Sequence, residues 1–384
     1  MTTATQYIAE PNEANIRATL DSWRTQHPGM GVLALLPEGQ KAVAPLLQEI
    51  CAAHKIALMG AIFPALLVAD KFRSSGLWLL RFDQAPDYLL LDKLPHTGDG
   101  AERVAQEIAG KLRGQLGQDN EEVTLFLLFD GMLPNIATIL DELYLHLANR
   151  VHYAGANAGS ETFKPMPCLF DATRVVGDAV LVMLLKQHHG AILEHGYQLA
   201  EQTYTATSTA GNRITHIDWR PAFEVYCELV RARYGVEINR ENFYQYSVHF
   251  PFGIVRANHN VLVRIPVALA DDGSLICVGE VPPHSVLALL DAPAAGSRHT
   301  VEALAERMVA LNRAPLQDRD AMLFYCAGRR LHLGLEEAQA EVQDLQRRSG
   351  VRQVLGALSL GEIGASTLWG YPLFHNATIV ATLW

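Results

Sequence analysis

The sequence lacks the paired cysteines, long apolar runs and export signals that define several common classes of protein. Its five cysteines, at positions 51, 168, 227, 277 and 326, are odd in number and widely spaced, with no C-x-x-C pair. This pattern excludes a zinc ribbon or a dithiol redox motif and favours reduced, buried thiols. No apolar run approaches the roughly 20 residues of a membrane helix. The amino terminus has no basic region followed by an apolar one, so it does not resemble a signal peptide. We therefore expect a cytoplasmic protein with no membrane partner.

The chain also has few charged residues, at 19%, and its net charge of -10 makes it acidic. An acidic chain without a basic stripe is a poor nucleic-acid binder, so we expect no nucleic-acid partner. Common catalytic motifs are missing too. The glycines of residues 155–159 (GANAG) are not followed by the Lys-Ser/Thr of a phosphate loop, and neither G-x-S-x-G nor H-E-x-x-H occurs. The sequence therefore predicts a protein that is not an enzyme.

What the chain does contain is apolar sequence, at 49% of 384 residues, which is enough for two domains with substantial cores. Short apolar runs alternate with helical patterns in the first 160 residues. We predict strands at 31–36, 56–59, 77–82, 88–91 and 123–129, and helices at 41–54, 101–116 and 134–149. This alternation is typical of an α/β half.

After residue 165 the pattern changes to successive strand-like runs. We predict hairpins that pair 179–185 with 191–199, 204–209 with 213–219, and 261–269 with 274–278. Helices are expected at 221–233, 300–311 and 335–348, the last one exposed, and further strands at 321–326, 354–358 and 379–383. The expected class is α+β, with an α/β N-terminal half followed by an antiparallel-hairpin-rich C-terminal half. No short repeat is evident.

Five segments together resemble one known family of sensory domains. They are 153–160 (YAGANAGS), 190–197 (GAILEHGY), 214–226 (ITHIDWRPAFEVY), 323–329 (LFYCAGR), and 361–363 with 374–378 (GEI and FHNAT). In this order they resemble the FIST family, whose members combine a FIST N and a FIST C part. The resemblance implies an N-terminal extension over 1–29, a FIST N domain over 30–165 and a FIST C domain over 166–384.

The resemblance also suggests a ligand. A branch similar to this chain, the nitric-oxide-sensing haemoproteins called NosP, carries a histidine in the glycine-aromatic segment that corresponds to residues 190–197, where this chain has His195. It implies a haem sensor of nitric oxide that regulates a separate histidine kinase or cyclic-di-GMP enzyme, and such sensors are often homodimers. Haem needs an axial donor in an apolar pocket. His195, near Tyr197, is the first candidate ligand, and His249, followed closely by Phe250 and Phe252, is the second.

Two alternatives remain open. Arg329 follows a predicted buried strand and Glu362 follows a glycine, so both are candidates to line a cleft and pair with a small metabolite such as an amino acid. The competing interpretation is a buried structural ion pair. An enzyme acting on a small molecule with the same two residues is the other alternative. His188 and His189 are weaker candidates for a metal site with His195, and His375 is expected to bond the backbone.

Overall fold

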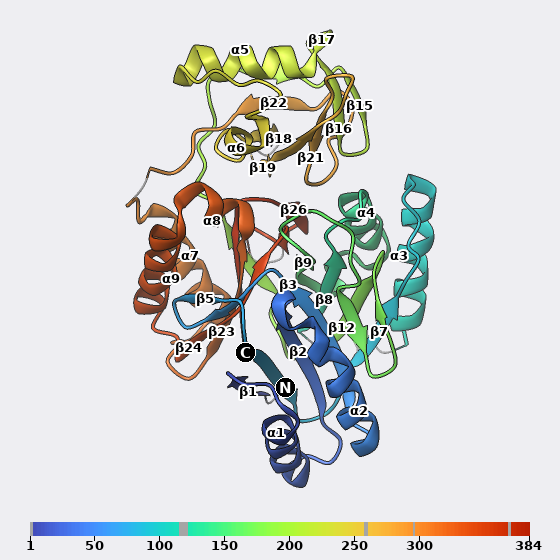
Figure 1. Ribbon diagram of the computed structural model, residues 1–384. Coiled ribbons are helices and arrows are strands. Elements are labelled where there is room, and N and C mark those ends of the chain that lie inside the picture. The colour runs from blue at the N-terminus through green and yellow to red at the C-terminus, as the bar shows by residue number, and fades with distance from the viewer. Residues whose placement is uncertain (1–2, 115–121, 257–259, 295, 368–369) are drawn as a thin grey trace.

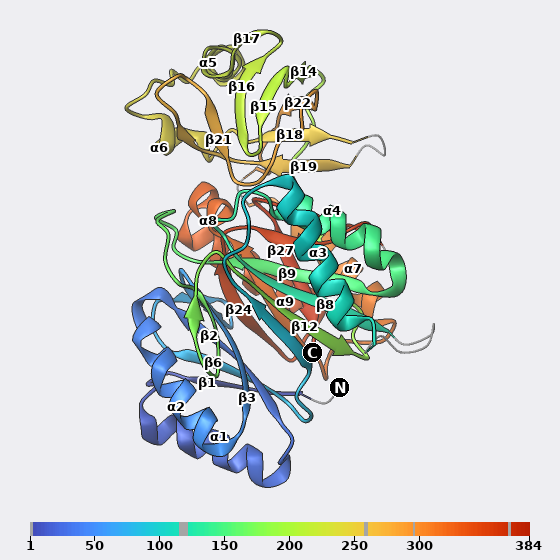
Figure 2. The ribbon, with the colours of Figure 1, turned by 90° about the vertical axis from the view of Figure 1, so that its right-hand side faces the viewer.

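The computed structural model describes residues 3–114, 122–256, 260–294, 296–367 and 370–384. They form a core of three six-stranded sheets and an insert with two smaller sheets at one end (Figure 1). In both views the insert lies beyond the core, and the helices of the first 60 residues lie at the opposite end (Figure 2). The mixture of helices and strands confirms the predicted α+β class.

The first unit of the core is built around a buried parallel pair of strands. Residues 31–37 (GVLALLP) are buried along their whole length, as expected for a central strand covered on both faces. The elements of this unit are β1 (Thr3–Ile8), α1 (Glu13–Gln26), β2 (Gly31–Pro37), η1 (Glu38–Val43), α2 (Ala44–His54), β3 (Ala57–Phe63), β4 (Leu66–Val68), β5 (Lys71–Arg73) and β6 (Leu77–Phe82). β2 pairs parallel to β3, and β6 returns antiparallel to β2.

The second unit repeats this order. Its elements are β7 (Asp87–Leu91), α3 (Gly98–Leu112), β8 (Val123–Asp130), α4 (Ile136–Leu147), η2 (Ala148–Arg150), β9 (His152–Ala158), β10 (Leu169–Asp171), β11 (Val175–Val176) and β12 (Val180–Lys186). β8 pairs parallel to β9, and β12 returns antiparallel to β8.

The third unit has the same order but is interrupted by the insert. It starts with β13 (Ala191–Glu194) and resumes with α7 (His299–Asn312), β23 (Asp320–Cys326), α8 (Ala327–Leu333), α9 (Leu335–Ser349), β24 (Gln353–Ser359), β25 (Glu362–Gly364), β26 (Leu373–His375) and β27 (Ile379–Leu383). β23 pairs parallel to β24, and β27 returns antiparallel to β23.

The three units exchange their hairpins in a closed cycle. Hairpin β4–β5 of the first unit completes the sheet of the third, β10–β11 of the second completes that of the first, and β25–β26 of the third completes that of the second. Each unit therefore depends on another to cover a sheet edge. A division of the chain at residues 165 and 166 would separate β10 from the sheet that it completes.

The repeat leaves a faint mark in the sequence. The second parallel strand of each unit carries a Gly-Ala pair at the same position, in ALMGAIF, HYAGANA and QVLGALS. A Cβ on Gly155 would lie 1.9 Å from the carbonyl oxygen of Leu127, and one on Gly356 would lie 1.9 Å from that of Leu323. Glycine is needed at these two positions because the strands approach too closely for a side chain.

The insert has its own hydrophobic core. Its elements are β14 (Tyr204–Thr205), β15 (Ser208–Ala210), β16 (Arg213–Ile217), β17 (Arg220–Pro221), α5 (Ala222–Tyr234), α6 (Phe243–Ser247), β18 (Phe252–Val255), β19 (Val261–Arg264), β20 (Pro266–Leu269), β21 (Leu275–Cys277) and β22 (Val286–Leu289). β18 is flanked by β19 and β22, and β21 is flanked by β16 and β20. Buried side chains of α5, including Tyr226, pack against both small sheets.

Three predictions of local structure differ from the structure. The strand predicted at 261–269 is divided, since β19 pairs with β18 and only β20 pairs with β21. The expected hairpin of 179–185 with 191–199 does not form, because β12 pairs with β7 and β8 whereas β13 pairs with β27 in another sheet. The helix expected to be exposed, α9, instead buries Glu341 and Asp344 together with its apolar side chains. Within the described residues, every helix is too short or too polar to cross a bilayer.

Candidate functional site

A pocket of about 290 Å³ lies where the insert meets the core. It opens beside the carboxyl ends of β23 and β24, the edge where ligands commonly bind parallel sheets. The insert contributes Tyr244, Ser247 and Val248 from the α6 region and Ile265, Pro266, Val267 and Val278 around β20 and β21. The core contributes Glu161, Phe163, Cys326, Ala327, Gly328, Arg330, Leu331, Leu360 and Asn376. Apolar walls with a few polar groups are typical of a small-molecule site.

Two charged side chains face the pocket from the core. Arg330 donates to Glu161 across 2.7 Å, and the side chains are 24% and 48% exposed, respectively. The guanidinium of Arg330 also lies 5.7 Å from the ring centroid of Phe72. Because water reaches both charges, a ligand can replace this ion pair at little cost.

Asn376 links the two walls of the pocket. Its Oδ1 accepts a hydrogen bond of 3.3 Å from the backbone amide of Ile265 in the insert, and its Nδ2 donates to the carbonyl of His375 across 3.0 Å. A ligand that contacts the amide would therefore sense the position of the insert.

The insert is tied to the core at two further points. Glu280 accepts bonds from the backbone amides of Ala137, at 2.7 Å, and Thr138, at 3.1 Å, at the start of α4. A carboxylate at the start of a helix satisfies amides that lack intrahelical partners and complements the helix dipole. Arg264, which is only 2% exposed, donates to the carbonyls of Glu280 and Phe374 across 2.9 and 2.8 Å.

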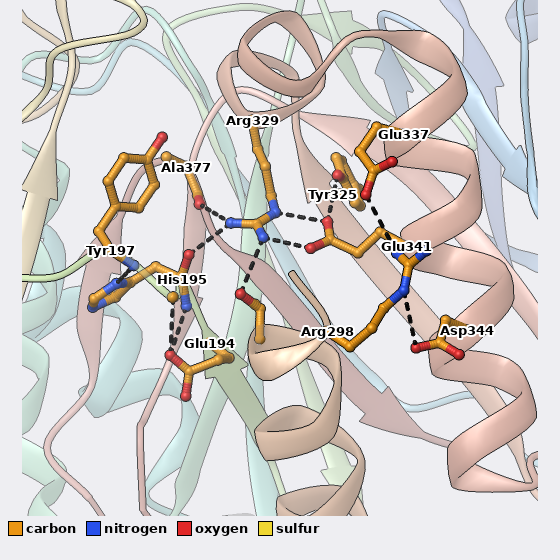
Figure 3. Close-up of polar contacts among 12 residues, drawn as sticks. Glu194, His195, Tyr197, Arg298, Tyr325, Arg329, Glu337, Glu341, Asp344 and Ala377 are labelled. Atoms are coloured by element: carbon orange, nitrogen blue, oxygen red, sulfur yellow. Dashed lines mark hydrogen bonds and ion pairs between the residues drawn. The ribbon is translucent and has the colours of Figure 1, made fainter. Parts of the chain in front are cut away.

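Arg329 does not face the pocket. It is 1% exposed and donates to both carboxylate oxygens of Glu341, from Nε at 2.8 Å and from Nη2 at 2.5 Å (Figure 3). Burial alone would lower the pKa of Arg329, but the charge and hydrogen bonds of Glu341 raise it above its ordinary value. Arg329 therefore forms a buried ion pair rather than a ligand contact, but its partner is Glu341 and not Glu362.

Glu362 is also buried away from the pocket lining. It is fully inaccessible and accepts bonds from Ser359 Oγ at 2.6 Å and Thr378 Oγ1 at 2.7 Å. Burial raises the pKa of Glu362 to about 8, against the opposite effect of these hydrogen bonds. The carboxyl group is therefore part of the core network near β25 and makes no ion pair with Arg329.

His195 lies just after β13 rather than within a strand. Its Nδ1 accepts from the amide of Tyr197 across 3.0 Å, and its carbonyl accepts from Arg329 across 2.6 Å. Burial lowers the pKa of His195, and a hydrogen bond to the backbone of Val261 opposes that effect. The imidazole is neutral, but its ring atoms already have protein partners.

His249 is brought close to the same region through His332 of α8. The two Nδ1 atoms lie 2.9 Å apart, and the ring of His332 lies 6.3 Å from that of Tyr197. Burial lowers the pKa of both imidazoles, that of His332 to about 4. The structure therefore collects His195, Tyr197, His249 and His332 at the contact between insert and core.

The aromatic side chains that follow His249 pack against other residues of the insert. The ring of Phe250 stacks on Tyr234 with centroids 4.7 Å apart, and Phe252 packs against Tyr226 at 5.3 Å. Phe252 is fully buried in the insert core. These rings are not walls of the pocket.

The remaining candidates are dispersed. His188 is buried and bonds Thr124 and Thr382, while His189 lies with Glu122 and His152 rather than with His195. His375, expected to bond the backbone, is buried with neither ring nitrogen hydrogen-bonded among the described residues. Cys326 is buried, and burial raises the pKa of its thiol, which disfavours the reactive thiolate.

Two family models match the chain. The FIST N domain covers residues 33–220 and the FIST C domain covers 222–365. The chain belongs to the FIST family. FIST domains are sensory domains of signal transduction, and the resemblance noted from sequence is thereby confirmed. No curated protein matches the chain at a significant level.

The pocket between insert and core contains two functional candidates that the sequence analysis did not name, Arg330 and Glu161. Arg330 directly follows Arg329, and successive residues of an α-helix point about 100° apart, so Arg329 turns into the core while Arg330 faces the pocket. A pair of neighbouring arginines at a strand-to-helix junction was the available signal. Glu161 carried none, because only the tertiary structure brings it to Arg330.

Proposed function

We propose that this FIST protein is a sensor that binds a small, amino-acid-like metabolite in the pocket between insert and core. The proposal rests on the observation that residues of the insert and residues of the core line the same pocket. A ligand held there contacts the two walls at once, so it favours one placement of the insert over others. That change in placement is the signal.

The chemistry of the lining favours a zwitterion with an apolar side chain. Arg330 offers a guanidinium for a carboxylate and Glu161 offers a carboxylate for an ammonium group, and the two already lie 2.7 Å apart. Apolar side chains of Val267, Ile265 and Leu360 line the same cavity. An amino-acid-like ligand was the alternative to haem in the sequence analysis, and the pocket assigns its recognition to Arg330 and Glu161 instead of Arg329 and Glu362.

A thermal-shift screen of amino acids tests the proposal. A ligand at 100 times its Kd adds about 2.7 kcal/mol of stability, which raises the melting temperature. We expect this rise to disappear in Arg330→Gln and in Val267→Phe, which fills the cavity. The control is Arg220→Gln, because Arg220 pairs with Glu228 on the exposed surface of the insert. A rise that persists in both pocket variants would place the ligand elsewhere.

Haem binding and nitric oxide sensing form the second proposal, supported by the neighbouring imidazoles of His195, His249 and His332. The described pocket does not fit a haem held by His195. Its lining contains no histidine, and the ring of His195 is bonded to the backbone of Tyr197 and Val261. Haem ligation would therefore require this contact between insert and core to open.

An absorption spectrum separates the two proposals. Saturable one-site haem uptake with a sharp Soret band, lost or shifted in His195→Ala or His249→Ala, would support the haem sensor. Weak, non-saturating adsorption would refute it while leaving the amino-acid screen unaffected.

The output side of the proposal rests on the family resemblance. We propose that the protein acts in the cytoplasm without turnover, as a homodimer, and regulates a separate histidine kinase or cyclic-di-GMP enzyme. The enzymatic alternative needed Arg329 and Glu362 in the site, and both are buried in contacts within the protein. Copurification of a kinase or cyclic-dinucleotide enzyme that depends on added ligand tests the partner.

A further inference from the structure

Three potential metal ligands meet at one end of the strands of the second sheet, away from the pocket. Glu122 immediately precedes β8, His152 is the first residue of β9, and His189 follows β12. These three strands are neighbours in the sheet. One ligand atom from each side chain lies within 4.8 Å of the other two.

Two of the three ligand-atom separations lie on either side of the spacing in a tetrahedral site, and all three atoms lie within 4.8 Å of one another. Oε2 of Glu122 lies 2.6 Å from Nε2 of His152 and 3.7 Å from Nδ1 of His189. Ligands bonded to zinc at about 2.0 Å with tetrahedral angles are about 3.3 Å apart. Shifts of less than about 1 Å would therefore place these three atoms around one ion.

The backbone holds the three residues in place independently of any ion. The amide of His188 donates to the carbonyl of Glu122 across 3.2 Å, and Thr124 Oγ1 donates to the carbonyl of His188 across 2.8 Å. The ring of His188 is fixed between Thr124 and Thr382. A buried, bonded His188 thus positions its neighbour His189 at this end of the strands.

One carboxylate and two imidazoles meet here, and these are side chains that commonly bind zinc. Arg313 lies 3.6 Å from Oε1 of Glu122, on the oxygen that the histidines leave free.

Space for a further ligand is present beside the histidines. A small cavity of about 20 Å³ is lined by both His152 and His189. A cavity of about 10–15 Å³ or more can hold one water molecule. Three protein ligands with water in the fourth position form a common zinc arrangement.

We propose that Glu122, His152 and His189 bind one divalent transition-metal ion of the zinc class, with water as the fourth ligand. The ion takes the place of the hydrogen bond between Nε2 of His152 and Glu122, and binding weakens as the pH falls because protons compete with the ion for the ligand atoms. This site is independent of the proposed sensory pocket. The competing possibility is a purely structural cluster of hydrogen bonds and ion pairs.

The test is calorimetric titration of the full-length, untagged, EDTA-treated protein with Zn²⁺, together with the visible spectrum of the Co²⁺ form. We expect one equivalent to bind, and to bind more weakly at lower pH. Removing an outer contact of a metal site typically costs 10–100-fold in affinity, so loss of a ligand in His189→Ala or Glu122→Gln should weaken binding at least about tenfold. Circular dichroism checks that both variants fold; His189 is partly exposed, so we expect its variant to do so.

Two histidine variants serve as controls. His216→Ala removes an exposed imidazole in the insert, and His249→Ala disrupts the other close pair of histidines; neither should change the titration. Arg313→Gln removes a competing cation, so affinity should stay the same or increase. Absence of saturable binding, binding that survives in both His189→Ala and Glu122→Gln, or binding lost in His249→Ala would overturn the proposal.

Discussion

Replacing Glu341 by glutamine is the sharpest test of how the third unit is held together. The carboxylate of Glu341 accepts two bonds from Arg329, at 2.8 and 2.5 Å, and one from Tyr325 Oη at 2.6 Å (Figure 3). Glutamine keeps the shape of the side chain but removes its charge. Arg329 would remain buried and charged with only neutral partners, chiefly the carbonyl of His195 at 2.6 Å.

The expected cost follows from breaking one side of a buried ion pair. Such changes typically destabilise a protein by about 3–5 kcal/mol, because an uncompensated charge is left in the interior. Unfolding entropy is about 2.1 cal/mol/K per residue, which gives about 0.8 kcal/mol/K for a chain of this length that unfolds as one unit. The melting temperature should therefore fall by about 4–6 °C.

Calorimetry at pH 7 measures the shift, and the same helix supplies a matched control. Glu337, one turn earlier, pairs with Arg298 at 3.3 Å, but those side chains are 27% and 35% exposed. Glu337→Gln should cost less than about 1 kcal/mol because water screens the pair. Replacing both Arg329 and Glu341 by apolar residues should recover much of the loss. If Glu341→Gln melts like Glu337→Gln, the ion pair does not stabilise the core as argued.

Three further predictions concern the contact of Glu280 with α4, the buried carboxyl group of Glu362, and the glycine of the repeated strands at Gly356. Glu280→Gln should cost about 1–2 kcal/mol by weakening the cap on α4, and hydrogen exchange of the Thr138 amide should speed up. Between pH 4.5 and about 8, folded Glu362 holds a proton that the unfolded chain releases, so stability should fall as the pH rises. Glu362→Gln should flatten that part of the stability profile in urea titrations, and an unchanged slope would refute the assignment. Gly356→Ala should cost at least about 3 kcal/mol, because its Cβ would strike the carbonyl oxygen of Leu323. Gly235→Ala, at a helix end with open space, should cost only about 1–2 kcal/mol in the same denaturation assay.

The candidate site was predictable only in outline. The sequence pointed to an arginine after the strand at 321–326, and an arginine from that turn does reach the pocket. It is Arg330 rather than Arg329, since the direction of each side chain depends on how α8 packs. Glu161 comes from a different unit, and its ion pair with Arg330 spans 169 residues of sequence.

What the sequence determined by itself was local. Apolar runs such as 123–129 and 321–326 are strands because they bury side chains on both faces. The six helices that the sequence predicted begin and end within a few residues of the predicted bounds, whereas α1, α6 and α8 were not predicted. The family followed from short segments that retain their order along the chain.

Only the tertiary structure decided which strands pair. The runs at 180–186 and 191–194 look like a hairpin in sequence, yet they enter different sheets. Hairpin exchange among the three units joins segments up to hundreds of residues apart, and alternation of polar and apolar residues does not encode such partners. The pocket and the cluster of Glu122, His152 and His189 arise in the same way, because each is assembled from segments that only the folded sheets bring together.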